Sequence, residues 1–167
     1  MPATYEPIAT NTLSTATPSV TFSSIASTYT DLKVVIVATS SGSRTIWLRF
    51  NSDTANNYSV TELYGNGTSA NALSQINFSA INLAGAANLS TTIPHLYSID
   101  VFSYRGSTNK TVLATKAGDQ NGSGNYVADV GLWRNTAAIT SLTLQCGNGA
   151  DDFSIGSTFT LYGIKNA

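Results

Sequence analysis

The carboxylates are the residues of this 167-residue chain whose type and number could support catalysis. A glycosidase needs two of them facing each other across a cleft, roughly 5–10 Å apart. Asp100 and Asp129 lie in the middle of segments that we expect to be strands, so a pair is conceivable there. We favour the simpler interpretation, in which each acid is solvated or bonds a neighbouring arginine or backbone amide. The acids are Glu6, Asp31, Asp53, Glu62, Asp100, Asp119, Asp129, Asp151 and Asp152.

The single histidine, His95, is the next candidate for chemistry. A Ser-His-Asp hydrolase would need it as the base, but no Gly-X-Ser-X-Gly element accompanies it. A zinc site takes three or four protein ligands, and one histidine with one cysteine cannot supply them. The sequence also contains no Walker loop. We therefore expect no enzyme activity, no cofactor and no metal, and we interpret His95 as an ordinary residue at a strand edge.

The loop around Asp151 and Asp152 offers oxygen ligands of the kind that Ca²⁺ prefers. These acids follow Gly147-Asn148-Gly149, and their spacing does not match an EF-hand loop. We favour a polar turn, and the sequence leaves calcium binding by Asp151 and Asp152 open.

Charge is scarce throughout the chain. Only 10% of the residues are charged, against about 25% in an average soluble domain. The eight basic residues are scattered singly and the net charge is −1, so we expect neither a nucleic-acid footprint nor an anionic membrane as partner. Such a low net charge gives little repulsion between copies, which suits a subunit of an assembly.

The lone cysteine and the start of the chain bear on the compartment. Cys146 continues the apolar alternation of Leu142 and Leu144, so we expect a buried free thiol and no intrachain disulfide. The first residues lack a basic region followed by an apolar one, so we expect no secretory signal. No apolar run approaches the ~18 residues that cross a bilayer. We expect a soluble protein made in a reducing cytoplasm.

Short runs of β-branched and aromatic residues, bounded by turn residues, recur along the chain. In one of them Ile46, Leu48 and Phe50 face one way and Trp47 and Arg49 the other, which is the period of a strand. No segment keeps a helical period, so the sequence predicts an all-β fold: an antiparallel two-sheet β-sandwich, jelly-roll-like. The expected strands are Ser19–Phe22, Leu32–Thr39, Thr45–Phe50, Ser59–Tyr64, Gln75–Leu83, Leu96–Tyr104, Thr111–Lys116, Tyr126–Arg134, Ile139–Gln145 and Phe159–Ile164.

The first 18 residues differ from the rest. Three of the four prolines of the chain fall there, and proline does not fit a regular helix or a central strand. We expect residues 1–18 to form an extended N-terminal arm, anchored at Tyr5, Ile8 and Leu13, and residues 19–167 to form a single β-sandwich domain.

Two tryptophans are candidates for contact with another molecule. Trp47 and Trp133 alternate with residues that we assign to the core, so we expect both on the outer faces of their strands. A subunit interface is favoured over sugar stacking, because Trp and Tyr are enriched at interfaces. The Leu32–Ala38 run is apolar on both faces apart from Lys33, which indicates a strand covered on both sides or shared with a partner. Candidate interface residues are therefore Tyr5, Ile8, Leu13, Trp47 and Trp133.

Three segments resemble a known group of proteins. They are TYEPIAT at 4–10, SVTFSSIASTYTDL at 19–32 and the tail GSTFTLYGIK at 156–165. Together they resemble small β-sandwich virion proteins of tailed bacteriophages. The resemblance covers the first fifth of the chain and about its last ten residues, and the matching patterns are structural. It implies a capsid decoration (cement) protein or a tail or fibre component.

These observations lead to one expectation and its alternatives. We expect a non-enzymatic virion subunit, made in the bacterial host cytoplasm, that decorates the capsid and stabilises the head by binding the major capsid protein. It would assemble with copies of itself, as a homotrimer. The alternatives are a tail-fibre or baseplate module and, from a different class, a carbohydrate-binding module.

Overall fold

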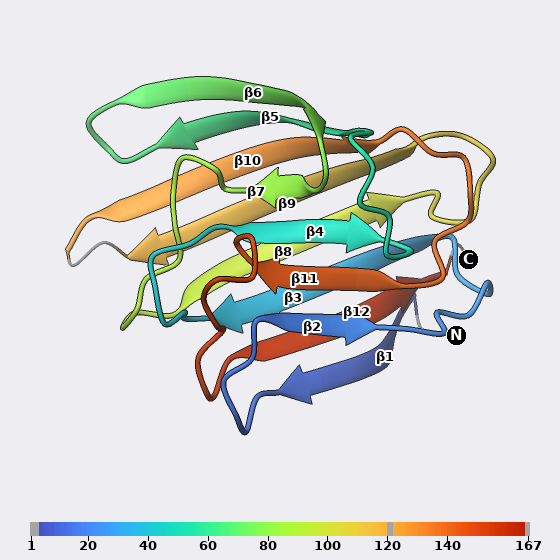
Figure 1. The fold of residues 1–167 in the computed structure, drawn as a ribbon, viewed down its shortest axis with the longest axis horizontal. Coiled ribbons are helices and arrows are strands. Elements are labelled where there is room, and N and C mark those ends of the chain that lie inside the picture. The colour runs from blue at the N-terminus through green and yellow to red at the C-terminus, as the bar shows by residue number, and fades with distance from the viewer. Residues whose placement is uncertain (1–3, 120–121, 166–167) are drawn as a thin grey trace.

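The computed structural model describes residues 4–119 and 122–165 and consists of twelve strands joined by turns and loops (Figure 1). Within these residues there is no helix, and therefore no helix long and apolar enough to span a membrane. The strands are β1 Tyr5–Thr12, β2 Ser19–Phe22, β3 Asp31–Ala38, β4 Ile46–Phe50, β5 Tyr58–Gly65, β6 Ala70–Phe78, β7 Ile81–Leu83, β8 His95–Phe102, β9 Lys110–Asp119, β10 Gly124–Trp133, β11 Leu142–Cys146 and β12 Thr158–Ile164.

The strands form two antiparallel sheets that pack as two layers. The large sheet has eight strands in the order β1-β12-β3-β8-β9-β10-β5-β6, and the small sheet has four in the order β2-β11-β4-β7. Figure 1 shows the small sheet in front of the middle of the large one, with β1 and β6 at the two edges. This arrangement confirms the all-β class and the two antiparallel sheets.

The segment expected as an arm contains the first strand. β1 pairs with β12 from Tyr5 opposite Ile164 to Thr12 opposite Thr158, with a bulge between Pro7 and Ala9. Leu13, which follows, is 7% exposed and belongs to the core. Residues 4–13 therefore lie against their own domain as an edge strand, while residues 1–3 fall outside the described part of the chain.

Most expected strands are present, with one merged and one missed. The predicted strand Gln75–Leu83 is two strands in different sheets: β6 ends at Phe78 and β7 begins at Ile81. The backbone turns between them, since Asn77 has a φ of 55° and Ala80 is already buried. The missed strand is β1, where the prolines argued for an arm; Pro7 is tolerated because β1 is an edge strand.

An aromatic cluster fills one end of the space between the sheets. Trp133 is 1% exposed, and its ring centroid lies 5.5 Å from that of Phe50 and 6.1 Å from that of Tyr58. Its indole N–H donates to Asp53 Oδ2 over 2.8 Å. The prediction that Trp133 lies on an outer face is therefore wrong. Both faces of β10 carry apolar residues, so the alternation alone did not reveal which face is inside.

Candidate functional site

At the opposite end of the interior, two carboxyl groups meet. Glu62 on β5 and Asp129 on β10 are direct cross-strand partners, and both are fully buried. Glu62 Oε1 accepts a hydrogen bond from the Ala86 amide over 2.9 Å, and Asp129 Oδ2 accepts one from the Ala84 amide over 2.8 Å. Burial raises the pKa of Asp129 to about 7, against the lowering effect of the Ala84 amide, and the neighbouring carboxylate of Glu62 raises it further.

A buried lysine completes this polar end. Lys116 on β9 is 1% exposed, and its ammonium donates to the carbonyls of Ala87 (3.1 Å) and Asn88 (3.3 Å) and to Asn125 Oδ1 (3.2 Å). Burial lowers the pKa of Lys116 to about 8. The turn 84–88 is therefore held from both sides: its amides bind the acids and its carbonyls bind the lysine.

His95 lies beside this cluster, as the first residue of β8. The side chain is 2% exposed, and its Nε2 lies 3.4 Å from the backbone oxygen of Asp119. Burial, and then the nearby Lys116 charge, lowers the pKa of His95, so the ring is neutral at pH 7. Gly118 makes room for this ring, because a Cβ there would approach within 2.7 Å of it.

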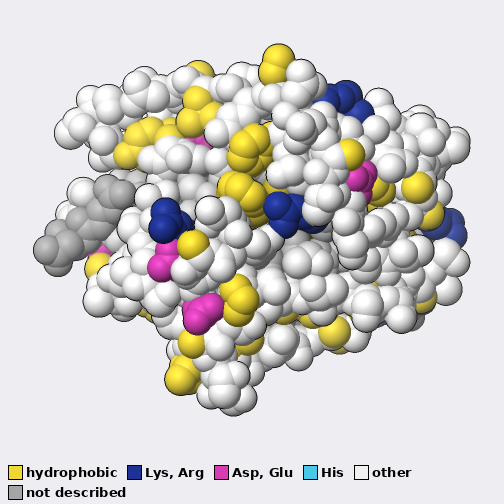
Figure 2. Space-filling model, viewed as in Figure 1, with side chains coloured by type: hydrophobic (Ala, Val, Ile, Leu, Met, Phe, Trp, Pro, Cys, Tyr) yellow, Lys and Arg dark blue, Asp and Glu magenta, His cyan; other side chains and the backbone are white. Residues whose placement is uncertain are grey.

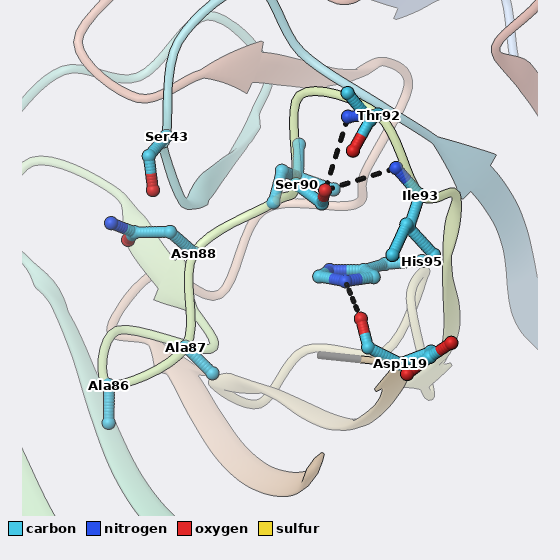
Figure 3. Close-up of a pocket in the computed structure, with 10 residues that line it drawn as sticks. Ser43, Ala86, Ala87, Asn88, Ser90, Thr92, Ile93, His95 and Asp119 are labelled. Atoms are coloured by element: carbon cyan, nitrogen blue, oxygen red, sulfur yellow. Dashed lines mark hydrogen bonds between the residues drawn. The ribbon is translucent and has the colours of Figure 1, made fainter. Parts of the chain in front are cut away.

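A polar pocket opens next to His95. Figure 3 shows it between His95 and Asp119 on one side and Ser43 and Asn88 on the other. Its volume is about 430 Å³. The Ser90 hydroxyl accepts hydrogen bonds from the amides of Thr92 (3.1 Å) and Ile93 (3.0 Å), which shapes the loop that covers it. Its lining includes Ala87 and Asn88, whose carbonyls bind Lys116.

The geometry of the acids differs from the pair considered from the sequence. Asp100 points out of the large sheet, where it pairs with Lys33 over 2.8 Å, so it does not meet Asp129. Glu62 and Asp129 do lie together, but each of these two buried carboxyls has one oxygen bound to an amide of the turn 84–88. Their contacts fix the turn 84–88, which is a structural task. Asp151 pairs with Arg44, and the described residues hold no group of three or more histidines, cysteines or acids suited to a metal ion.

The outer face of the large sheet is open and carries few charges, with apolar side chains set among serines and threonines. Apart from Asp31 and Asp119 at strand ends, its central strands from β12 to β5 carry only one pair of outward charges, Lys33 and Asp100. Its outward, exposed large apolar side chains are Val37, Leu63, Leu96, Phe102, Leu113, Tyr126 and Val130. The outward side of β3, which the sequence indicated as covered or shared, is uncovered in the single chain.

A groove of about 290 Å³ crosses the other side of the molecule, over the small sheet. Trp47 lies in it half-buried, with the Arg49 guanidinium 5.3 Å from its ring centroid and Phe78 packed edge-on. The groove shares Ser43 and Asn88 with the pocket beside His95. Few charged side chains lie on this side, as Figure 2 shows. The groove is lined mainly by Arg44, Trp47, Asn82, Asn88 and Asn148.

The candidate interface residues are not brought together. Tyr5 is 54% exposed on β1, Ile8 packs partly against the core, and Leu13 is buried. Trp47 lies on the outer face of the small sheet, as expected, whereas Trp133 is in the core. The sequence reasoning missed Glu62, Lys116 and the open face of the large sheet. An acid and a lysine at inward positions of otherwise apolar strands were the signal available.

Comparison with models of protein families, with curated proteins and with solved structures found no match to this chain. The resemblance to phage virion proteins therefore stays a prediction from the segments that carry it.

Proposed function

We propose that this chain is a non-enzymatic structural subunit of a virion, a capsid decoration protein that attaches to the shell through the outer face of its large sheet. The observation that carries the proposal is this open, weakly charged face with its exposed apolar side chains. Soluble monomers rarely expose large contiguous apolar patches, and those that exist usually mark contact with another protein. The virion setting and the major capsid protein as partner come from the resemblance of the first and last segments.

The size of the face suits a stable attachment. Eight strands spaced about 4.8 Å apart, each with about eight or nine residues rising about 3.3 Å, span roughly 1,000 Å². Stable interfaces take about 800 Å² from each partner. The central strands of the face carry one outward ion pair, so covering the face costs little free energy for desolvating charged side chains.

The test adds purified protein to phage particles that lack it. Leu113 and Val130 are exposed cross-strand neighbours on the face, so the double variant Leu113→Lys/Val130→Lys should weaken attachment at least tenfold. The matched control is Thr21→Lys/Thr143→Lys, a cross-strand pair on the outer face of the small sheet, which should attach normally. Equal attachment of the two variants, or no attachment of the unaltered protein, would overturn the proposal. A label seen on the tail by electron microscopy would favour the tail-fibre or baseplate alternative.

The proposal also includes two details expected from the sequence: a jelly-roll-like strand path, and residues 1–18 acting as an arm. To reach a neighbour, β1 would have to leave β12. A chain that begins at Ser19 should then fold cooperatively and attach less well. If that chain does not fold, β1 is a necessary strand of the domain.

The groove at Trp47 favours a second candidate, binding of a neutral saccharide. An indole ring flanked by the amides of Asn82, Asn88 and Asn148 can stack on a sugar and bond its hydroxyls. An array of neutral glycans tests it: Trp47→Ala should abolish any binding, and Tyr126→Ala, on the other face, should not. An array on which no glycan binds excludes this candidate.

A further inference from the structure

The free edge of β6 is the second uncovered feature of the large sheet. β6 is the last strand in the sheet order, so only one of its sides is paired, with β5 (Figure 1). Its nine residues, Ala70–Phe78, include neither a charged residue nor a proline. Ile76 is 71% exposed, and none of the nine is buried. Natural proteins usually protect such edges against pairing with other strands.

The other edge of the same sheet has that protection. β1 contains Pro7, carries Glu6 in an ion pair with Lys165 over 2.7 Å, and is bulged between Pro7 and Ala9. β6 has a bulge only near its end, where Ile76 and Asn77 lie opposite a single residue of β5. Before that bulge, residues 70–75 run in register with β5 and leave a straight edge open.

We propose that β6 pairs antiparallel with β6 of a second copy, so that the two large sheets join into one continuous sheet. A two-fold axis perpendicular to the sheet keeps the inner faces of both copies on the same side. Centred on Leu73, it sets Leu73 opposite its own copy, Asn71 opposite Gln75, and Ala72 opposite Ser74. Every pair is apolar or uncharged, so no like charges face each other across the contact.

A second copy fits this edge better than an unrelated strand for two reasons. The edge has no charge with which to select a charged partner. When β6 pairs antiparallel with its own copy, uncharged residues lie opposite each other along the contact. A two-fold contact also closes on itself, which uses up both β6 edges and stops further growth. The dimer is independent of attachment to a shell and differs from the homotrimer expected from the sequence.

The test measures the mass of the full-length protein by analytical ultracentrifugation at micromolar concentrations. We expect a dimer. Leu73→Lys puts two ammonium groups opposite each other at the axis and should weaken the dimer at least tenfold, whereas the uncharged variant Leu73→Gln should stay dimeric. Asn11→Lys, which adds the same charge to the β1 edge, should also stay dimeric. A monomer for the unaltered protein overturns the proposal, as does a dimer that survives Leu73→Lys or dissociates with Asn11→Lys.

A cysteine scan tests the register separately. Directly opposite residues of antiparallel strands have Cα atoms about 4.5–5.5 Å apart, within the range of a disulfide. Under mild oxidation, Leu73→Cys should therefore form a covalent dimer. Ala70→Cys should not, because its own copy would lie about six residues away along the strand, about 20 Å. The native Cys146 is buried and should not interfere. Failure of Leu73→Cys to cross-link overturns the pairing centred on Leu73.

Discussion

The two ends of β10 lie in the same interior but are built differently. Near its C-terminal end, Trp133 packs between Phe50 and Tyr58 and makes one hydrogen bond, to Asp53. Toward its N-terminal end, Asp129 and Asn125 belong to a network of hydrogen bonds with Lys116 and the turn 84–88. The small sheet covers the aromatic end, while a loop covers the polar end.

This difference shows what each covering requires. A sheet presents side chains, so apolar rings can pack against it and contribute through burial. A loop presents backbone amides and carbonyls, which must find partners when buried. Glu62, Asp129 and Lys116 supply those partners. The aromatic end should therefore set the overall stability, and the polar end should set how stability depends on pH.

The largest expected effect is at the aromatic end. Trp133→Ala removes the largest fully buried side chain and leaves a cavity beside Phe50 and Tyr58. It should lower the free energy of unfolding by about 3–5 kcal/mol, measured by urea denaturation. Trp47→Ala, which shortens the half-buried tryptophan of the small sheet, is the control and should cost clearly less. Equal losses in the free energy of unfolding would show that the aromatic end contributes no more to stability than the half-buried Trp47.

The polar end should produce a minimum in stability between pH 7 and 8. From about pH 4 to 7 the folded protein holds the Asp129 proton that the unfolded chain has released, so stability falls as pH rises. From about pH 8 to 10.5 the unfolded chain holds the Lys116 proton that the folded protein has released, so stability rises again. Each slope is at most about 1.4 kcal/mol per pH unit.

Denaturation at a series of pH values checks this profile by difference. Asp129→Asn should remove the fall between pH 4 and 7 relative to the unaltered protein, since the amide does not titrate and its oxygen still accepts from the Ala84 amide. Asp100→Asn, on the outer face, should leave the profile unchanged. A profile that Asp129→Asn does not alter would show that Asp129 does not hold the proton taken up on folding.

A smaller loss is expected when the lysine is replaced. Lys116→Met keeps much of the side-chain volume but leaves the carbonyls of Ala87 and Asn88 without their donor. An unsatisfied buried acceptor costs about 1–3 kcal/mol, and part of this is offset because a charge no longer has to be buried. Hydrogen exchange should show the amides of 84–88 opening faster. Unchanged hydrogen exchange at these amides would show that Lys116 does not stabilise the turn.

The smallest effect is expected outside the interior. Lys33→Met breaks the ion pair with Asp100, whose side chains are 23% and 28% exposed. Pairs of this kind contribute about 0–1 kcal/mol, so the free energy of unfolding should change by less than that. Urea denaturation of Lys33→Met and Lys116→Met under the same conditions measures the difference. A loss as large as that of Lys116→Met would remove the distinction between buried and outward lysines.

Local patterns predicted the strands well and their neighbours poorly. The bounds Ser19–Phe22 were predicted as the structure has them, because that run is short, alternating and flanked by turn residues. The partner of Asp129 was not predictable in this way, since β10 pairs with β5 across more than 60 residues of sequence. The side of β10 that is buried depends on the same long-range pairing, and this is why Trp133 was assigned to the wrong face.

The positions of β11 and β12 have a consequence for how the chain folds during synthesis. β12 lies between β1 and β3, and β11 lies between β2 and β4. Until residues 142–164 have left the ribosome, each sheet lacks an internal strand, and the strands on either side of the gap have unpaired backbone groups. Folding that waits for such distant pairings is slow and exposes strand edges meanwhile. The nascent protein should therefore depend on chaperones until its last strands are made.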